Sequence, residues 1–192
     1  MERELSESFY SKDPKEVARD LLGKILINET EEGTVKGRIV ETEAYYGEKD
    51  PASHAYRGKT GRTEIMWGKP GIAYVYFTYG KYYLFNVVAH KEGEAGAVLI
   101  RAVEPMEGIS LMQKRRGKKE IKGLTKGPAK LTQSFKIDNK ENGIDLTKGN
   151  FRIEEREEKD FNIISCTRVG IKRGKKEALR FYIENNEFVS KK

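Results

Sequence analysis

The chain has 192 residues, and its 37 Lys and Arg exceed its 30 Asp and Glu to give a formal net charge of +7. Hydrophobic residues make up 37% of it and fall in periodic runs through the middle, which argues against general disorder. A single Cys excludes an intramolecular disulfide framework, and with only two His there is no Cys/His set for a zinc cluster.

The length is typical of one domain, and we take residues 1–192 as a single domain. The stretch MERELSESFYSKD lacks the apolar centre of a signal peptide, and no run approaches the roughly 20 apolar residues of a membrane span. We therefore expect a cytoplasmic protein with no membrane partner. The positive charge favours a polyanionic partner, although a Lys-rich surface that only aids solubility would give the same charge.

The first predicted elements are a helix and two strands. Asp13 is a candidate N-cap, Pro14 suits the first turn, and Gly23 suits the end of a helix over KEVARDLLG. KILINE predicts a strand, TEEG a turn, and residues 34–46 a second strand. We expect residues 47–62 to form a loop with one helical turn, and TEIMWG to form a short helix.

The middle of the chain predicts a hairpin. Residues 72–89 are two aromatic-rich strands joined by a tight turn at Tyr79, Gly80 and Lys81. The next strand, AGAVLIRAVEP, is expected to stop at Pro105, and helices follow over residues 106–115 and KGPAKLTQSF. We expect residues 136–160 to be polar and irregular, and late strands in NIISCTRVG and ALRFYIEN. Few βαβ units appear, so the order predicts an α+β fold.

Two glutamates stand out in the stretch RIVETEAYYG. Glu41 and Glu43 share a strand face with Ile39 and Tyr45. Carboxylates are rarely buried in a strand without a partner. One interpretation is ion pairing with Arg or Lys on neighbouring strands; the other is a desolvated carboxylate that acts as a general base or acid.

The hairpin concentrates aromatic hydroxyl groups around one turn. Tyr79 lies at its tip beside Gly80, where a core cannot easily reach. An exposed aromatic flanked by Lys81 is a candidate for stacking on bases, and the alternative is a tyrosine packed on its own loop. Lys126 and Lys130 in KGPAKL form a candidate phosphate site.

These motifs, in this order, resemble the alkylpurine (3-methyladenine) DNA glycosylases of the alkyladenine type. The resemblance starts near Asp13 and runs through GRIVETEAYYG, DPASHAYRGKTGRTEIMWGKPGIAYVYFTYGKYYLFNVV and AVLIRAVEP. It continues through LTKGPAKLTQSF, TRVG and LRFYIENNEFVS, and so covers nearly the whole chain.

The resemblance implies a monofunctional DNA glycosylase of base excision repair. It would flip an alkylated or deaminated purine out of double-stranded DNA and hydrolyse the N-glycosidic bond, leaving an abasic site. No metal or cofactor is implied, and we expect a monomer, associated with the nucleoid if the source is prokaryotic. The implied fold is a curved, mostly antiparallel sheet, a partly open barrel, with packed helices and a hairpin that protrudes into the minor groove.

The catalytic residues implied by the resemblance surround one water molecule. Glu43 would be the general base that activates the water. Arg101 and the backbone carbonyl of Val169 would help to hold the water and Glu43. Glu41 is implied as a neighbour without a role in the chemistry.

The resemblance also implies a base-binding pocket and a wedge. Tyr45 and Tyr76 would sandwich the flipped base, His54 would contact its edge, and Asn86 would exclude the 2-amino group of guanine. Tyr79 would fill the hole left in the base stack.

Contacts to the DNA backbone are expected from Arg62, Lys81, Lys126 and Lys130. Gly61 and Lys81 depart from the residues frequent in the family, which bears on DNA affinity rather than on the reaction. Two rival functions stay open: a nucleic-acid-binding module without catalysis, and an enzyme acting on free nucleosides or RNA. The sequence leaves the preferred lesion open among 3-methyladenine, 7-methylguanine, hypoxanthine and ethenoadenine.

Overall fold

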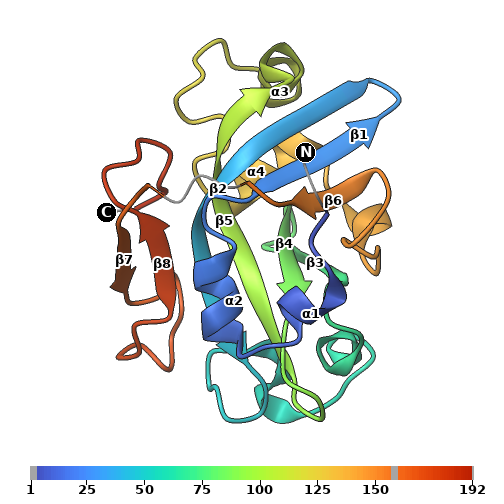
Figure 1. Cartoon of the computed structure of the whole chain (residues 1–192), viewed down its shortest axis with the longest axis vertical. Coiled ribbons are helices and arrows are strands. Elements are labelled where there is room, and N and C mark those ends of the chain that lie inside the picture. The colour runs from blue at the N-terminus through green and yellow to red at the C-terminus, as the bar shows by residue number, and fades with distance from the viewer. Residues whose placement is uncertain (1–3, 157–159, 192) are drawn as a thin grey trace.

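The computed structural model describes residues 4–156 and 160–191. It has an α+β fold in which a curled antiparallel sheet forms a half-barrel, with helices packed on it (Figure 1). The strands are β1 (Ile25–Thr30), β2 (Gly33–Tyr46), β3 (Ala73–Thr78), β4 (Tyr82–Val88), β5 (Gly96–Glu107), β6 (Phe151–Glu154), β7 (Ile163–Cys166) and β8 (Arg180–Ile183). The helices are α1 (Glu7–Tyr10), α2 (Pro14–Asp20), α3 (Ile109–Arg116) and α4 (Pro128–Phe135), with short 3₁₀ turns η1 (His54–Arg57), η2 (Glu64–Trp67) and η3 (Asn139–Glu141). The predicted fold class is confirmed.

Strand β2 is the centre of the sheet, whose main path is β3-β4-β5-β2-β1-β6. One edge of β2 pairs with β5 along most of its length. The other edge pairs first with β1, from residue 33 to 38, and then with β8, from residue 41 to 43. The β7–β8 ribbon therefore lies next to the part of β2 that carries the two glutamates (Figure 1).

The two faces of β2 meet different helices. The Thr42 hydroxyl donates a 2.7 Å hydrogen bond to the Ala18 carbonyl, which places α2 on one face. On the other face, Gly37 is so close to α4 that a Cβ atom there would lie 3.1 Å from the Phe135 ring. Because side chains alternate along a strand, Glu41 and Glu43 point to the α4 side.

Helix α2 begins as its sequence predicts, but it ends at Asp20 and a turn leads on to Gly23. Asp13 accepts a 2.8 Å hydrogen bond from the Lys15 amide, and Pro14 occupies the first turn. Gly23 follows the helix with a φ of 88°, a value that glycine adopts without strain. Val17 and Leu21 are fully buried against the sheet, so the apolar side of the helix contributes to the main core.

Helix α4 crosses the opposite face and is held by side-chain hydrogen bonds to the sheet. Its Thr132 hydroxyl donates to the Tyr83 carbonyl of β4 at 2.8 Å. The Asn28 amide of β1 donates to the Phe135 carbonyl, also at 2.8 Å. Leu131 and Phe135 are completely buried, and the N-terminal turn of α4 is thereby fixed beside the pocket described below.

The β3–β4 hairpin closes with the predicted tight turn. Thr78 pairs with Tyr82, and the Lys81 amide donates to the Thr78 carbonyl at 3.2 Å. Tyr79 and Gly80, the two central residues, have φ values of 52° and 61°. Two successive positive φ values are the signature of a type I′ turn, whose twist matches that of the flanking strands.

Three expectations about element bounds are wrong. Strand β5 continues past Pro105 to Glu107, because Pro105 lies at a register shift opposite Gly37, and a β-bulge tolerates a proline. Helix α3 consequently begins at Ile109 rather than at residue 106. The segment expected to be irregular contains η3 and strand β6, which pairs with β1; its residues 157–159 lie outside the described residues.

The described residues contain no helix long and apolar enough to cross a membrane. In the same part of the chain, no group of three or more His, Cys, Asp or Glu is placed to hold a metal ion.

Candidate active site

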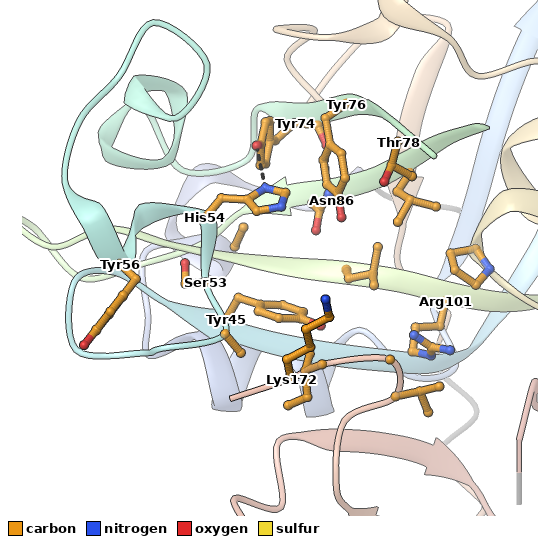
Figure 2. Close-up of a pocket in the computed structure, with 18 of the residues that line it drawn as sticks. Tyr45, Ser53, His54, Tyr56, Tyr74, Tyr76, Thr78, Asn86, Arg101 and Lys172 are labelled. Carbon is orange, nitrogen blue, oxygen red and sulfur yellow. Dashed lines mark hydrogen bonds between the residues drawn. The ribbon is translucent and has the colours of Figure 1, made fainter. Parts of the chain in front are cut away.

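A pocket of about 780 Å³ opens on the face of β2 opposite to α2. Tyr45 of β2 forms one side, and Tyr76 of β3 with His54 of η1 forms the side facing it (Figure 2). The residues that sequence reasoning places in the site and that line this pocket are Tyr45, His54, Tyr76, Tyr79, Asn86, Arg101, Lys130 and Val169. Residues scattered over 125 positions of the printed sequence thus meet in one place.

Glu43 lies directly behind the pocket wall and is fully buried. Its Oε1 accepts a 2.7 Å hydrogen bond from the Val169 amide and lies 3.2 Å from Arg101 Nη1. Its Oε2 accepts a 2.7 Å hydrogen bond from the Tyr45 hydroxyl. Donors at both oxygens hold the carboxylate among three residues that line the pocket. The expected role of the Val169 carbonyl stays a prediction, since the contact present here is made by the amide of the same residue.

Glu41 is also fully buried but is enclosed by its own set of donors. Its Oε1 accepts from Arg101 Nε at 3.0 Å and from Arg180 Nη1 at 2.9 Å. Ser190 adds its amide, 2.6 Å from Oε2, and its hydroxyl, 3.0 Å from Oε1. The ion-pair interpretation therefore describes Glu41 well, and both carboxylates share Arg101.

A β-bulge brings Arg101 between the two carboxylates. Thr42 pairs with Ile100 and Glu41 pairs with Ala102, so Arg101 is the extra residue on β5. An extra residue in one strand bends it locally and redirects the side chain. Arg101 is 6% exposed and can reach both Glu41 and Glu43, which a regular pairing register does not provide.

The aromatic residues of the pocket form a continuous cluster. His54 Nδ1 and the Tyr74 hydroxyl are 2.9 Å apart, as the dashed line in Figure 2 shows. The rings of His54 and Tyr76 meet edge to face with centroids 4.6 Å apart. Asn86 is buried at the back of this cluster and donates a 3.1 Å hydrogen bond to the Tyr74 carbonyl. The sequence did not single out Tyr74 for the site, although it belongs to the same run of tyrosines.

The pocket environment shifts the pKa of several of these groups. Burial, with the nearby charge of Glu43, raises the pKa of the Tyr45 hydroxyl far above 10, so this group stays a proton donor. Burial likewise raises the pKa of Tyr76. Desolvation by its neighbours, together with the charge of Arg62, lowers the pKa of His54 from 6.5 to about 4 although part of its side chain is exposed. His54 is therefore neutral at physiological pH.

Tyr79 projects from the tip of the hairpin. It is 86% exposed, so the alternative of a tyrosine packed on its own loop is wrong. Its φ of 52° is unusual for a bulky residue that is not glycine, and such backbone strain is concentrated at functional sites.

The residues expected to contact the DNA backbone lie around the pocket in different settings. Lys130 lines the pocket, and Lys126 forms an isolated bridge with Ala102 of β5. The Lys81 ammonium lies 5.7 Å from the centroid of the Tyr82 ring. The Arg62 side chain is exposed, and its guanidinium lies 4.9 Å from the centroid of the Tyr76 ring. Their contacts with phosphates stay predictions.

A buried ion pair next to Tyr45, between Arg168 and Asp50, was not predicted from the sequence. The Arg168 guanidinium donates to both carboxylate oxygens of Asp50, at 2.5 and 2.9 Å, and to the Ala44 carbonyl at 3.0 Å. It also lies 4.7 Å from the centroid of the Tyr45 ring. Both residues stand in motifs that carry the family resemblance, DPASH and TRVG, but nothing in the sequence shows that these motifs meet.

Comparison with known proteins gives one consistent result. The family described as "Methylpurine-DNA glycosylase (MPG)" matches residues 8–187. A protein of Carboxydothermus hydrogenoformans named "Putative 3-methyladenine DNA glycosylase" is 51% identical over 190 residues, which cover 98% of this chain and 99% of that protein. A protein of the same name from Clostridium botulinum (strain Langeland) is 47% identical over 201 aligned positions, with the same coverage of both chains.

These matches span the strands and loops that build the pocket. The resemblance inferred from the motifs is confirmed, and so is the class of reaction. The chain belongs to the methylpurine-DNA glycosylase family and is a DNA glycosylase, a hydrolase that acts on DNA.

Proposed function

We propose that this protein flips alkylated or deaminated purines out of duplex DNA and hydrolyses their N-glycosidic bond, leaving an abasic site. The observation that carries the proposal is a buried carboxylate, Glu43, held beside an aromatic pocket by Val169, Arg101 and Tyr45. All of these residues lie within one domain, and we propose a monomer as the working unit.

Glu43 is proposed as the general base. One of its oxygens faces the Val169 amide and Arg101, and the other faces Tyr45, so the carboxylate keeps one orientation at the pocket wall. A base in a fixed position can take a proton from a water that attacks the sugar carbon of a flipped nucleotide. Arg101, which contacts the same carboxylate, helps to hold this arrangement.

The pocket suits a purine stacked between two rings. Tyr45 and Tyr76 face one another in Figure 2 with His54 at the edge of the space between them. Alkylation of a ring nitrogen makes the base cationic and a good leaving group. Aromatic faces favour a cationic base by roughly 0.5–2 kcal/mol each, which supports binding of such lesions.

Deaminated and other neutral purines are poorer leaving groups than cationic alkylated purines. Their leaving group must be protonated, and the described residues that line the pocket include no Asp or Glu. We therefore propose that cationic lesions such as 3-methyladenine leave faster than hypoxanthine. Shape selection against normal guanine is assigned to Asn86, which is buried at the back of the pocket.

Base flipping is supported by the exposed Tyr79. Extracting a nucleotide costs a few kcal/mol in pairing and stacking, and the vacated space must be filled. Tyr79 is carried on the tight turn of three residues that joins β3 and β4, next to the pocket that it also lines.

The test uses duplex oligonucleotides that each carry one 3-methyladenine, 7-methylguanine, hypoxanthine or ethenoadenine. After incubation with the protein, alkali converts abasic sites into strand breaks that a denaturing gel resolves. We expect breaks only after alkali, since the proposed reaction involves no lysine nucleophile. Binding without any break would favour the rival binding module, and release of bases from RNA or free nucleosides but not from duplex DNA would favour the other rival.

A further inference from the structure

The loop between β7 and β8 carries a dense cluster of positive charge. Residues 171–176 read IKRGKK and contain four cations and no acid: Lys172, Arg173, Lys175 and Lys176. All four side chains are exposed, and none has a hydrogen bond or ion pair with another residue of the described part of the chain. Many other cations, such as Arg115 and Arg152, are paired with carboxylates. This loop is therefore a site of uncompensated charge.

The loop lies at the rim of the proposed base-binding pocket. Lys172 and Arg173 line the pocket, and Figure 2 shows Lys172 extending past the Tyr45 ring toward the open space. The hairpin residues Tyr76 and Tyr79 line the same pocket from the other side. At its start the loop is fixed to the catalytic carboxylate, because the Val169 amide donates to Glu43.

A buried ion pair anchors this loop to the sheet. The Arg168 side chain is fully buried and the Asp50 side chain is 2% exposed, and their paired contacts at 2.5 and 2.9 Å fix two planar groups. Arg168 also donates to the Ala44 carbonyl next to Glu43 on β2. The chain on either side of Arg168 thus has little freedom to move.

Gly174 packs the far part of the loop onto the same ion pair. A Cβ atom at this position would lie 3.1 Å from Arg168 Nη2 and 3.5 Å from Asp50 Oδ1. Its φ of 63° is in the left-handed region, where glycine is favoured. The loop that carries the four cations is therefore packed against the buried Arg168–Asp50 ion pair.

We propose that residues 171–176 bind phosphates of the DNA strand that carries the flipped nucleotide, as a second DNA contact opposite the hairpin. This inference rests on the proposed function. A nucleotide that enters the pocket brings its two flanking phosphates to the rim, where Lys172 and Arg173 lie. Cations that neutralise phosphates release bound counterions, so they supply salt-dependent affinity without reading sequence.

The experiment measures salt dependence. A fluorescein-labelled undamaged duplex and a matched ethenoadenine duplex are titrated with protein at several NaCl concentrations, and anisotropy gives the binding constant. To prevent excision during the titration, all proteins carry Glu43→Gln. For the variant Lys172→Ala/Arg173→Ala, the slope of log K against log salt should fall in magnitude by roughly two, since each lost phosphate contact removes about 0.9. Affinity at low salt should fall about tenfold or more.

The matched control is Lys15→Ala/Lys91→Ala, which removes the same charge from two exposed side chains that do not line the pocket. Its slope should stay near that of the parent protein. Equal slopes for the loop variant and the parent, or an equal loss in the control, would overturn the proposal. Both variants change exposed residues, and matching thermal unfolding midpoints show that they are folded.

A separate measurement distinguishes this proposal from the proposed function. In the presence of Glu43, the variant Lys175→Ala/Lys176→Ala, which changes loop residues outside the pocket lining, should excise ethenoadenine at saturating enzyme within about threefold of the wild-type rate, because every residue that lines the pocket is retained. Absence of excision by the wild-type protein would count against the proposed function, whereas the salt slopes would still report on the loop.

Discussion

Glu41 and Glu43 show how two identical side chains on one strand face acquire different roles. Glu41 is enclosed by two arginines and by Ser190, all of which hold it in the protein interior. Glu43 has one arginine, an amide and the Tyr45 hydroxyl, and its neighbours open directly onto the pocket. Glu41 therefore has the contacts of a structural charge, whereas Glu43 has the position required of the proposed general base.

Glu43→Gln should retain binding to lesion-containing DNA and lower single-turnover excision by at least about 10²-fold, the usual loss for a general base. Glu41→Gln provides the control: a partner is lost from a buried ion pair, so the free energy of unfolding should fall by about 3 kcal/mol. Excision by the folded Glu41→Gln protein should change much less. If Glu41→Gln is the more damaging to excision, the general base has been assigned to the wrong residue.

Asn86→Ser should change which purines leave. The shorter side chain opens room at the back of the pocket, where the Asn86 amide now contacts the Tyr74 carbonyl. We expect more release of 7-methylguanine and undamaged guanine relative to adenine lesions, measured by chromatography of the released bases. An unchanged guanine-to-adenine ratio would show that Asn86 does not control access.

His54 should titrate near pH 4 in the folded protein and near pH 6.5 in urea. The folded pKa is lowered, so the unfolded state binds more protons between these values, and this group makes the fold less stable as the pH falls from 6.5 to 4. Only His54 and His90 give imidazole signals in an NMR titration, and His54→Gln identifies the first. A His54 midpoint near 6.5 in the folded protein would contradict the desolvated pocket.

At the scale of elements, the turn of the β3–β4 hairpin determines where Tyr79 is placed. The type I′ turn places Tyr79 and Gly80 at the tip with no long loop, so the exposed ring is carried on two paired strands. Tyr76 and Thr78 of the same strand line the pocket. One short element therefore supplies both a wall of the pocket and the residue proposed to enter the duplex.

Tyr79→Ala should weaken the flipped state by roughly 1–3 kcal/mol, the usual value for losing one base-stacking aromatic. The loss should shrink when the lesion faces a mismatch, because less pairing has to be broken. Stopped-flow fluorescence of ethenoadenine, which brightens when unstacked, measures the flipping equilibrium. Equal flipping equilibria for the wild type and the variant, in both matched and mismatched duplexes, would show that Tyr79 has no part in flipping.

Most elements were predictable because their signals are local. The cap at Asp13, the alternation along residues 34–46 and the turn at Gly80 each depend on neighbouring residues. Strand β6 was missed because its four residues form a strand only by pairing with β1 across the fold. The end of β5 was wrongly predicted at Pro105 for the same reason, because the bulge that accommodates this proline depends on pairing with Gly37.

The candidate site likewise contains residues that the sequence identifies and contacts that only the fold reveals. Glu43, Tyr45 and Tyr79 lie within motifs that the family resemblance identifies. The Asp50–Arg168 ion pair joins residues 118 apart, and the effect of Gly174 depends on that pair, so neither could be found from spacing along the chain. The sequence analysis did not single out the run IKRGKK, and its place at the pocket rim is what supports the proposed contact with phosphates.

At the scale of the whole molecule, the site depends on a C-terminal segment that lies far from it in sequence. Val189 is fully buried, the Ser190 amide and hydroxyl bond to Glu41, and the Lys191 carbonyl accepts from Arg180. These contacts complete the set of donors around Glu41 and thereby fix Arg101, which also contacts Glu43.

Deletion of residues 189–192 should lower both stability and excision. It removes a buried valine and uncovers a charge that loses two donors, so the free energy of unfolding should fall by about 3 kcal/mol or more, measured by urea denaturation. Ser190→Ala keeps the amide and Val189, and should cost only about 1 kcal/mol. Equal stability of the deletion and the full chain would show that this segment does not support the ion network.

The bond between Ser190 and Glu41 spans 149 residues, and the bond between Arg180 and Glu41 spans 139. Contacts between such distant positions must overcome loop-closure entropy, so we expect them to form later in folding than local pairs such as the β3–β4 hairpin. During refolding, the circular dichroism of the sheet should therefore recover before excision does. We therefore expect excision activity to appear only after Arg180 and Ser190, which are synthesised long after Glu41, have come into contact with its carboxylate.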